Sequence, residues 1–194
     1  MFNKLTASTL AVICISALFL GCPSDEQRLA DLPAPIYNDD PMAASAARRS
    51  LPIERFTAYQ KVLLFDRQYI GIKFEHLENY TKWFTKLTWA MGIGHSVESY
   101  DCDNFAFMYK SLLSISSYKN WNTNAKYKDK QILVGTLLVY QTNSFGRIKG
   151  TKDGKHALNI VHTEKGWIVV EPQTGAWIEF EKYPNRDHII KIIF

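Results

Sequence analysis

Cysteine is scarce in this chain of 194 residues, which contains three in total. Two of them, Cys14 and Cys22, lie in the apolar N-terminal segment, so the rest of the chain has Cys102 alone. A single thiol excludes an intramolecular disulfide framework in that region. It must therefore depend on a hydrophobic core, for which a domain of roughly 140 residues is long enough.

Neither sign of charge is in large excess. The chain has 23 Lys and Arg against 19 Asp and Glu, a formal net charge of +4. A nucleic-acid-binding protein normally carries a clustered basic face, whereas the lysines between 119 and 155 are scattered. No nucleic-acid partner is therefore expected. The sequence also lacks zinc-ligand spacing and a phosphate-binding glycine loop.

The first residues have the pattern of an export signal. Lys4 precedes an apolar or small run from Leu5 to Leu20, which is too short for a typical membrane span. The five residues ending at Cys22 resemble a bacterial lipobox, although Phe19 stands where leucine is usual. We therefore expect a lipoprotein signal peptide at 1–21 and lipidation of Cys22. That places the protein in the bacterial cell envelope, at the outer membrane if the host is diderm. An ordinary cleaved signal or an uncleaved anchor is the alternative.

Prolines are frequent in residues 22–52, which predicts a flexible tether. One domain is then expected over 53–194. Apolar residues at helical spacing predict helices at 53–66, 74–91 and 102–116. Segments rich in β-branched and aromatic residues predict strands at 132–141, 156–163, 167–171, 176–180 and 188–194. This order predicts an α+β fold with N-terminal helices packed on a C-terminal antiparallel sheet.

Cys102 lies between Asp101 and Asp103 at the expected start of a helix. Unpaired N–H groups at a helix start favour an anion, and therefore a thiolate. The alternative, a buried core thiol, fits less well with two acidic neighbours. The negative charges of these two acids disfavour a thiolate at Cys102, unless their carboxylates turn away to cap the helix or bind a cation. Asp101, Asp103 and Asn104 carry hard oxygen ligands of the type that calcium takes.

His156 and Glu171 are expected to meet in a hairpin that turns near Gly166. A two-residue loop ending at Gly166 would pair residues whose numbers add up to 331, and a four-residue loop would pair residues whose numbers add up to 329. His156 then shares a sheet face with Glu171 and Gln173, at Cβ distances of ~5–8 Å. Glu171 could orient the imidazole, and His156 could take the thiol proton. A surface carboxylate is the alternative for Glu171, and no site role is expected for the other four histidines.

Three segments together resemble the papain-like and transglutaminase-like cysteine proteinase superfamily. They are Asp-Cys-Asp-Asn-Phe-Ala from Asp101, His-Ala-Leu-Asn-Ile-Val from His156 and Glu-Pro-Gln-Thr-Gly from Glu171. The pattern is similar to the proteinase domain of the Marasmius oreades agglutinin and to bacterial transglutaminase-like cysteine proteinases. The bacterial group has Asp where Glu171 stands. The resemblance implies a papain-like fold and a triad of Cys102, His156 and Glu171, with Gln173 beside it. Because both relatives depend on calcium, it also implies calcium at Asp101, Asp103 and Asn104.

These observations predict a membrane-anchored cysteine hydrolase, a peptidase or amidase that works through a thioester acyl-enzyme. Its partners would be a peptide or protein substrate and, through the N-terminal lipid, the membrane, with the protein itself a monomer. One alternative is transglutaminase-like acyl transfer. Another is a non-catalytic surface lipoprotein that uses the same fold to bind an envelope or peptide partner.

Overall fold

The structure is a computed structural model that describes residues 31–38, 41–51, 62–93, 101–121, 125–150 and 154–194. The chain forms two compact units, Met1–Leu32 and Pro33–Phe194, and all elements below belong to the second. The expected leader and Cys22 lie outside the described residues, and lipid anchoring stays a prediction. None of the helices in the described ranges is both long and apolar enough to cross a bilayer.

The described residues contain three α-helices, which are α3 (Ala44–Ser50), α4 (Phe74–Ala90) and α5 (Cys102–Trp121). The strands are β1 (Met42–Ala43), β2 (Val62–Leu63), β3 (Gln68–Ile70), β4 (Gln131–Ile132), β5 (Val134–Tyr140), β6 (Lys155–Thr163), β7 (Gly166–Glu171), β8 (Ala176–Glu179) and β9 (Ile189–Ile193). Short 3-10 helices are η2 (Ala125–Tyr127), η3 (Phe180–Lys182) and η4 (Arg186–His188).

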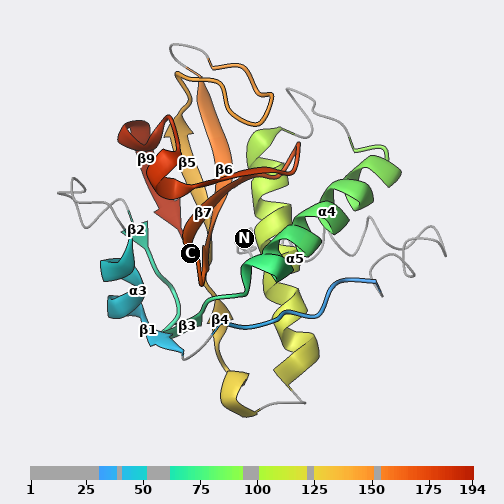
Figure 1. Cartoon of the computed structure of the whole chain (residues 1–194), viewed down its shortest axis with the longest axis vertical. Coiled ribbons are helices and arrows are strands. Elements are labelled where there is room, and N and C mark those ends of the chain that lie inside the picture. The colour runs from blue at the N-terminus through green and yellow to red at the C-terminus, as the bar shows by residue number, and fades with distance from the viewer. Residues whose placement is uncertain (1–30, 39–40, 52–61, 94–100, 122–124, 151–153) are drawn as a thin grey trace, which may run out of the picture. The chain divides into compact units, whose positions relative to one another are not determined.

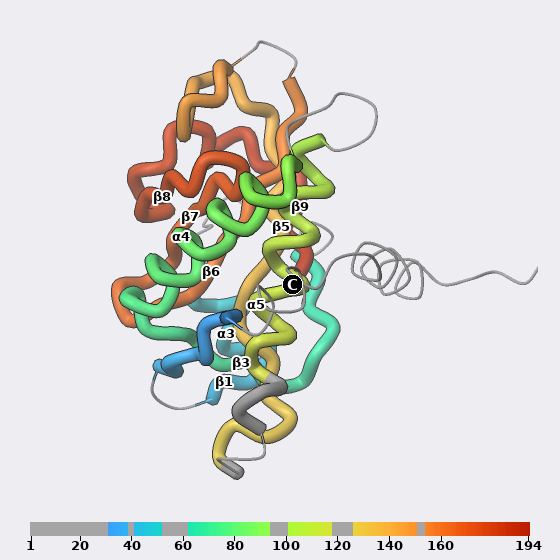
Figure 2. The backbone as a smooth tube through the Cα atoms, turned by 90° about the vertical axis from the view of Figure 1, so that its right-hand side faces the viewer, coloured from blue at the N-terminus to red at the C-terminus, as the bar shows by residue number. Residues whose placement is uncertain are grey.

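A six-stranded mixed sheet forms the main layer, in the order β2-β9-β5-β6-β7-β8 (Figure 1). Its pairs are antiparallel except β2 with β9, which run parallel. A second sheet has the order β1-β3-β4. Figures 1 and 2 both show this smaller sheet at the end of the unit opposite the β5–β6 connection. That connection carries much of the candidate site.

The expected fold class is corrected by this topology. The fold is mainly β, and its sheets are not built from the C-terminal half alone, because β1, β2 and β3 come from the front of the chain. The helix expected at 53–66 is wrong at its described end, where β2 pairs with β9. Pairing with a distant strand outweighs local helical spacing there. The expected helices at 74–91 and 102–116 and all five later strands agree with the structure within a few residues.

The helices α4 and α5 contact each other through buried aromatic side chains, with Tyr109 packed edge-on against Tyr80 and Phe84. Figures 1 and 2 show the course of the two helices. The Tyr80 hydroxyl donates to the carbonyl of Tyr109 at 2.8 Å, and the Tyr109 hydroxyl lies 2.6 Å from Oγ1 of Thr81. At the start of α4, the backbone N–H of Phe74 donates to Glu164 in the β6–β7 turn at 2.7 Å. This bond satisfies a helix-end donor and fixes α4 to the sheet.

The segment before β2 contributes to the core. Ala47 and Leu51 are buried in the same hydrophobic cluster as residues of β5, β6 and β9. The compact unit therefore includes residues 33–51, which lie within the expected tether. The boundaries at 22 and 52 otherwise stay a prediction.

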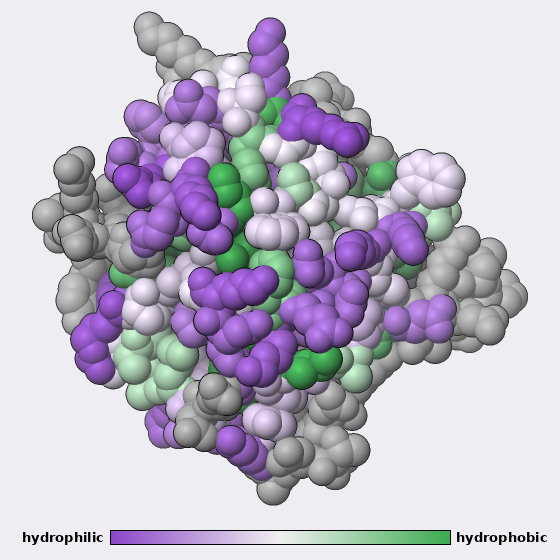
Figure 3. Space-filling model, viewed as in Figure 1, coloured by the Kyte–Doolittle hydropathy of each residue, from purple (hydrophilic) through white to green (hydrophobic). Residues whose placement is uncertain are grey.

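Hydrophilic side chains cover most of the face shown in Figure 3, and hydrophobic ones appear only in small, separate patches. A face of this kind offers no broad apolar area for another protein. A hollow lies at the N-terminal end of α5.

Candidate functional site

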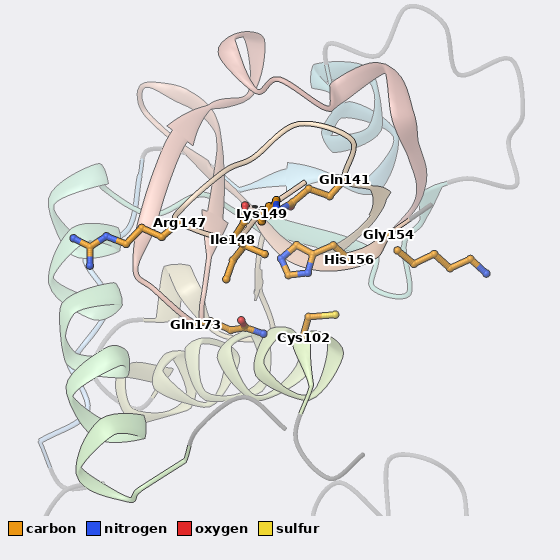
Figure 4. Close-up of a pocket in the computed structure, with 9 residues that line it drawn as sticks. Cys102, Gln141, Arg147, Ile148, Lys149, Gly154, His156 and Gln173 are labelled. Carbon is orange, nitrogen blue, oxygen red and sulfur yellow. Dashed lines mark hydrogen bonds between the residues drawn. The ribbon is translucent and has the colours of Figure 1, made fainter. Parts of the chain in front are cut away.

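A pocket of about 390 Å³ lies between the first turn of α5 and the β5–β6 connection (Figure 4). It is lined mainly by polar and basic side chains, and Cys102 lies in its wall. The lining residues are Cys102, Gln141, Arg147, Ile148, Lys149, Gly154, Lys155, His156 and Gln173. The pocket thus gathers residues from α5, from β6, from the β5–β6 connection and from the β7–β8 turn.

The position of Cys102 depends on how α5 meets the sheet. Asn159, which is fully buried in β6, donates from Nδ2 to the carbonyl of Ala106 at 2.9 Å and to that of Gly135 at 3.4 Å. Ala106 lies one helical turn after Cys102. The amide therefore fixes the first turn of α5 against β5 and β6, three residues along the chain from His156. The thiol is free and partly exposed.

His156 and Glu171 meet as the sequence predicted. Each pair between β6 and β7, such as Asn159 with Val170, has residue numbers that sum to 329. That register brings Nε2 of His156 to 2.5 Å from Oε2 of Glu171. His156 is 9% exposed and Glu171 is fully buried. Because Nε2 faces the carboxylate, Nδ1 is the ring nitrogen left to face the thiol. Figure 4 shows the imidazole directed toward Cys102.

The surroundings of His156 favour its charged form. Burial opposes a charge on the ring, but the hydrogen bonds with Cys102 and Glu171, together with the charge of Glu171, raise the pKa of His156 to about 9. The imidazole therefore carries a positive charge at neutral pH. A cation beside the sulfur stabilises a thiolate.

Glu171 is held on two sides. Its second oxygen, Oε1, accepts the backbone N–H of Gln173 at 3.0 Å. Gly146 approaches from the β5–β6 connection so closely that a Cβ there would lie 2.9 Å from Cβ and Cγ of Glu171. Its φ of +58° also suits glycine. Gln173 lines the pocket, and its Nε2 is buried without a hydrogen-bond partner among the described residues.

The acids beside the thiol bond to each other. A hydrogen bond from Asp103, assisted by the N–H groups of the first helical turn, lowers the pKa of Asp101. The same hydrogen bond, together with burial and the charge of Asp101, raises the pKa of Asp103. Asn104 donates from Nδ2 to Oδ1 of Asp101 at 3.2 Å. No group of three or more His, Cys, Asp or Glu in the described ranges is arranged to hold a metal ion. Calcium binding here stays a prediction.

Six lining residues were not identified from the sequence, and four of them are polar or basic: Gln141, Arg147, Lys149 and Lys155. The segment 142–155 was recognisable as a loop, but its residue types name no ligand. Only the fold shows that this loop returns over Glu171 and faces Cys102. The glycine at 146, which has no room for a side chain, is the one local signal that could have indicated the close approach.

No protein-family model and no curated protein sequence matches the chain. Solved structures of the Polyporus squamosus lectin share its fold. One, described as a PSL1a–E64 complex, has a TM-score of 0.54 and 18% identity, covering 79% of this chain and 51% of its own. Another is that lectin bound to the human-type influenza-binding epitope Neu5Acα2-6Galβ1-4GlcNAc, with a TM-score of 0.53, 19% identity, and coverage of 79% and 49%. The chain therefore spans about half the length of these structures, and at this identity the likeness concerns the fold.

These comparisons correct the assignment to the papain-like and transglutaminase-like superfamily, because the matching structures are those of a lectin. The expectations of a cysteine peptidase or amidase, of acyl transfer, and of the same fold serving as a non-catalytic binder are corrected with it. The ligand bound in one of these similar structures is a glycan and not the expected peptide.

Proposed function

We propose that this protein is a ligand-binding domain that captures its ligand at the thiol of Cys102. The observation that carries the proposal is the contact between His156 and Glu171, which keeps a charged imidazole beside a partly exposed sulfur. A lone exposed thiol would not need a buried ion pair behind it. Such a pair is costly to bury unless both partners are held, as they are here.

The capture step follows from the geometry. The thiol proton passes to solvent, because the imidazole of His156 is already protonated, and the sulfur lone pair forms a bond to an electrophilic carbon of the ligand. The electron pair of the bond that breaks leaves with the departing group, or moves to oxygen where the carbon belongs to a carbonyl. The product is the protein joined to its ligand through sulfur, with the positive charge kept on His156 and balanced by Glu171. The proposal concerns capture and requires no turnover.

Iodoacetamide labelling at pH 7, followed by intact mass, tests this proposal. Cys102 of the unaltered protein should react at least about tenfold faster than free cysteine, because a charged imidazole lies beside the reacting sulfur. The change His156→Gln should remove this advantage. His188→Gln, which alters an exposed histidine in η4, is the matched control. Labelling of the unaltered protein no faster than that of free cysteine would contradict the proposal.

A glycan is the second candidate ligand. It is favoured by the epitope bound in one of the similar structures and by two amides in the pocket lining, Gln141 and Gln173, each of which buries a polar atom without a partner among the described residues. Sugar hydroxyl and acetamido groups are complementary to such amides.

Calorimetric titration with Neu5Acα2-6Galβ1-4GlcNAc separates the two candidates. Glycan binding should survive Cys102→Ser, which abolishes capture, and should weaken in Gln141→Leu. Absence of binding to the unaltered protein would contradict the glycan candidate and leave the thiol proposal to be decided by labelling.

Calcium at Asp101, Asp103 and Asn104 is also retained as a proposal. Their oxygen atoms suit a hard cation, and the two carboxyls already lie close enough to share a hydrogen bond. Calcium should raise the thermal midpoint of the unaltered protein and not that of Asp103→Asn.

A further inference from the structure

The rim of the pocket carries three positive charges. Arg147, Lys149 and Lys155 line it, and all three are exposed. None of the three forms an ion pair with any residue in the described ranges, and none of the described lining residues is acidic. The nearby carboxylate of Glu171 is fully buried and bonded to His156. It therefore does little to offset the charge of the rim.

The wall of the pocket holds a buried acceptor without a partner. Gln141 is 2% exposed, and its Nε2 donates to the carbonyl of Ile148 at 3.2 Å. Its backbone N–H donates to the carbonyl of Gly154 at 2.8 Å. These bonds hold Gln141 in place, while Oε1 is buried without a hydrogen-bond partner among the described residues. A buried acceptor left unpaired is unfavourable, so a donor from a ligand would stabilise it.

We infer that the pocket selects small anionic ligands, with a carboxylate or sulfate facing the rim formed by Arg147, Lys149 and Lys155 and an N–H or O–H group donating to Oε1 of Gln141. The inference rests on the proposed function, because it assigns the ligand class of the same pocket. Figure 4 shows how the charges are spread: Lys149 lies near Gln141, and Arg147 projects along another side of the pocket. Cations spread in this way attract an anion toward the opening and leave the space beside Cys102 for the uncharged part of the ligand.

Two reagents of nearly equal size test the inference, since iodoacetate is an anion and iodoacetamide is neutral. With both, the sulfur displaces iodide from carbon. We compare the ratio of their rate constants in the unaltered protein with the ratio in Arg147→Gln/Lys149→Gln/Lys155→Gln. Removal of the three charges should lower the iodoacetate to iodoacetamide ratio by about fivefold at low salt, and 1 M salt should remove most of the difference.

The matched control removes three charges at the end of the unit opposite the β5–β6 connection. It carries Arg67→Gln, Lys128→Gln and Lys130→Gln in the connections before β3 and β4, and it should keep the ratio of the unaltered protein. A ratio that is the same in the rim variant and the unaltered protein would overturn the inference, while the iodoacetamide rate alone still reports on the proposed function.

A second readout does not depend on the thiol. In Cys102→Ser, acetate should shift the NMR signals of the Gln141 side-chain amide and the Ile148 backbone amide, and the rim changes should abolish these shifts. No shift with acetate or sulfate would overturn the inference even if both alkylating reagents react slowly. Slow reaction of the unaltered protein with both reagents would contradict the proposed function, whereas acetate shifts lost in the rim variant would still support the anion site.

Discussion

Oε2 of Glu171 lies 2.5 Å from Nε2 of His156, although 15 residues separate them in the chain. The β6–β7 register brings the two strands together, and the backbone N–H of Gln173 holds the other carboxylate oxygen. Each partner removes part of the cost of burying the other. The charge state of His156 is therefore the property most directly set by this contact.

The pKa of His156 should be about 9 and should depend on Glu171. Replacing Glu171 with Gln removes the negative charge while burial still opposes a charged ring, so the pKa should fall. NMR titration of the imidazole in the two proteins measures this difference. If the pKa of His156 is unchanged in Glu171→Gln, the carboxylate does not stabilise the protonated imidazole.

The same shift links stability to pH. A pKa raised in the folded state contributes stability that is complete below the unfolded value of ~6.5 and is lost as pH rises toward 9. Urea unfolding should therefore show a loss of up to about 3 kcal/mol from this group over that interval. In Glu171→Gln the loss should disappear. An equal decline in both proteins would assign it to other groups.

Gly146→Ala should destabilise the protein by about 1–3 kcal/mol and lower the pKa of His156. The added Cβ would lie 2.9 Å from Cβ and Cγ of Glu171 and would force the carboxylate or the loop to move. Gly92→Ala is the matched control, because Gly92 has a similar φ of +66° and nothing within 4 Å of an added Cβ. Urea unfolding and NMR titration give the two readouts. If Gly146→Ala and Gly92→Ala have equal effects on stability and on the pKa of His156, Gly146 is required only for its positive φ and not for its close approach to Glu171.

Asn159→Leu should lower the free energy of unfolding by about 1–3 kcal/mol, because it leaves the buried carbonyls of Ala106 and Gly135 without their donor. It should also slow labelling of Cys102 where the protein remains folded, since the first turn of α5 is no longer fixed to β6. Asn79→Leu, at an exposed position in α4, is the control. Unchanged labelling in a folded Asn159→Leu protein would show that this amide does not position the thiol.

His76 should make the protein sensitive to acid. Burial lowers its pKa to about 4, and its Nε2 has no hydrogen-bond partner among the described residues. A depressed pKa in the folded state means that stability is complete above ~6.5 and is lost as pH falls toward 4. Unfolding at pH 7 and pH 4 should show that His76→Leu loses less stability than the unaltered protein, by up to about 3 kcal/mol. Equal losses would contradict a buried, neutral His76.

The sequence was sufficient for those parts of the molecule that local pattern determines. Apolar spacing predicted α4 and α5, and the turn at Gly166 set the register that joins His156 to Glu171. It was insufficient for β2, whose two residues form a strand only because β9 lies beside them. The small sheet of β1, β3 and β4 likewise depends on pairing between distant segments.

The site was predictable to a similar extent. Cys102, His156, Glu171 and Gln173 could be named from their types and spacing, and the fold brings them together. Gln141 and the basic residues of the β5–β6 connection could not, because nothing local shows that this connection folds back over Glu171. Their place in the pocket is a property of the tertiary structure, set by the approach of Gly146.

The rate of Cys102 labelling by iodoacetamide at pH 7 in the unaltered protein and in Glu171→Gln tests the central claim most directly. If a charged His156, held by Glu171, promotes the reaction of the sulfur beside it, Glu171→Gln should lower the rate about tenfold. Equal rates in the two folded proteins would contradict it.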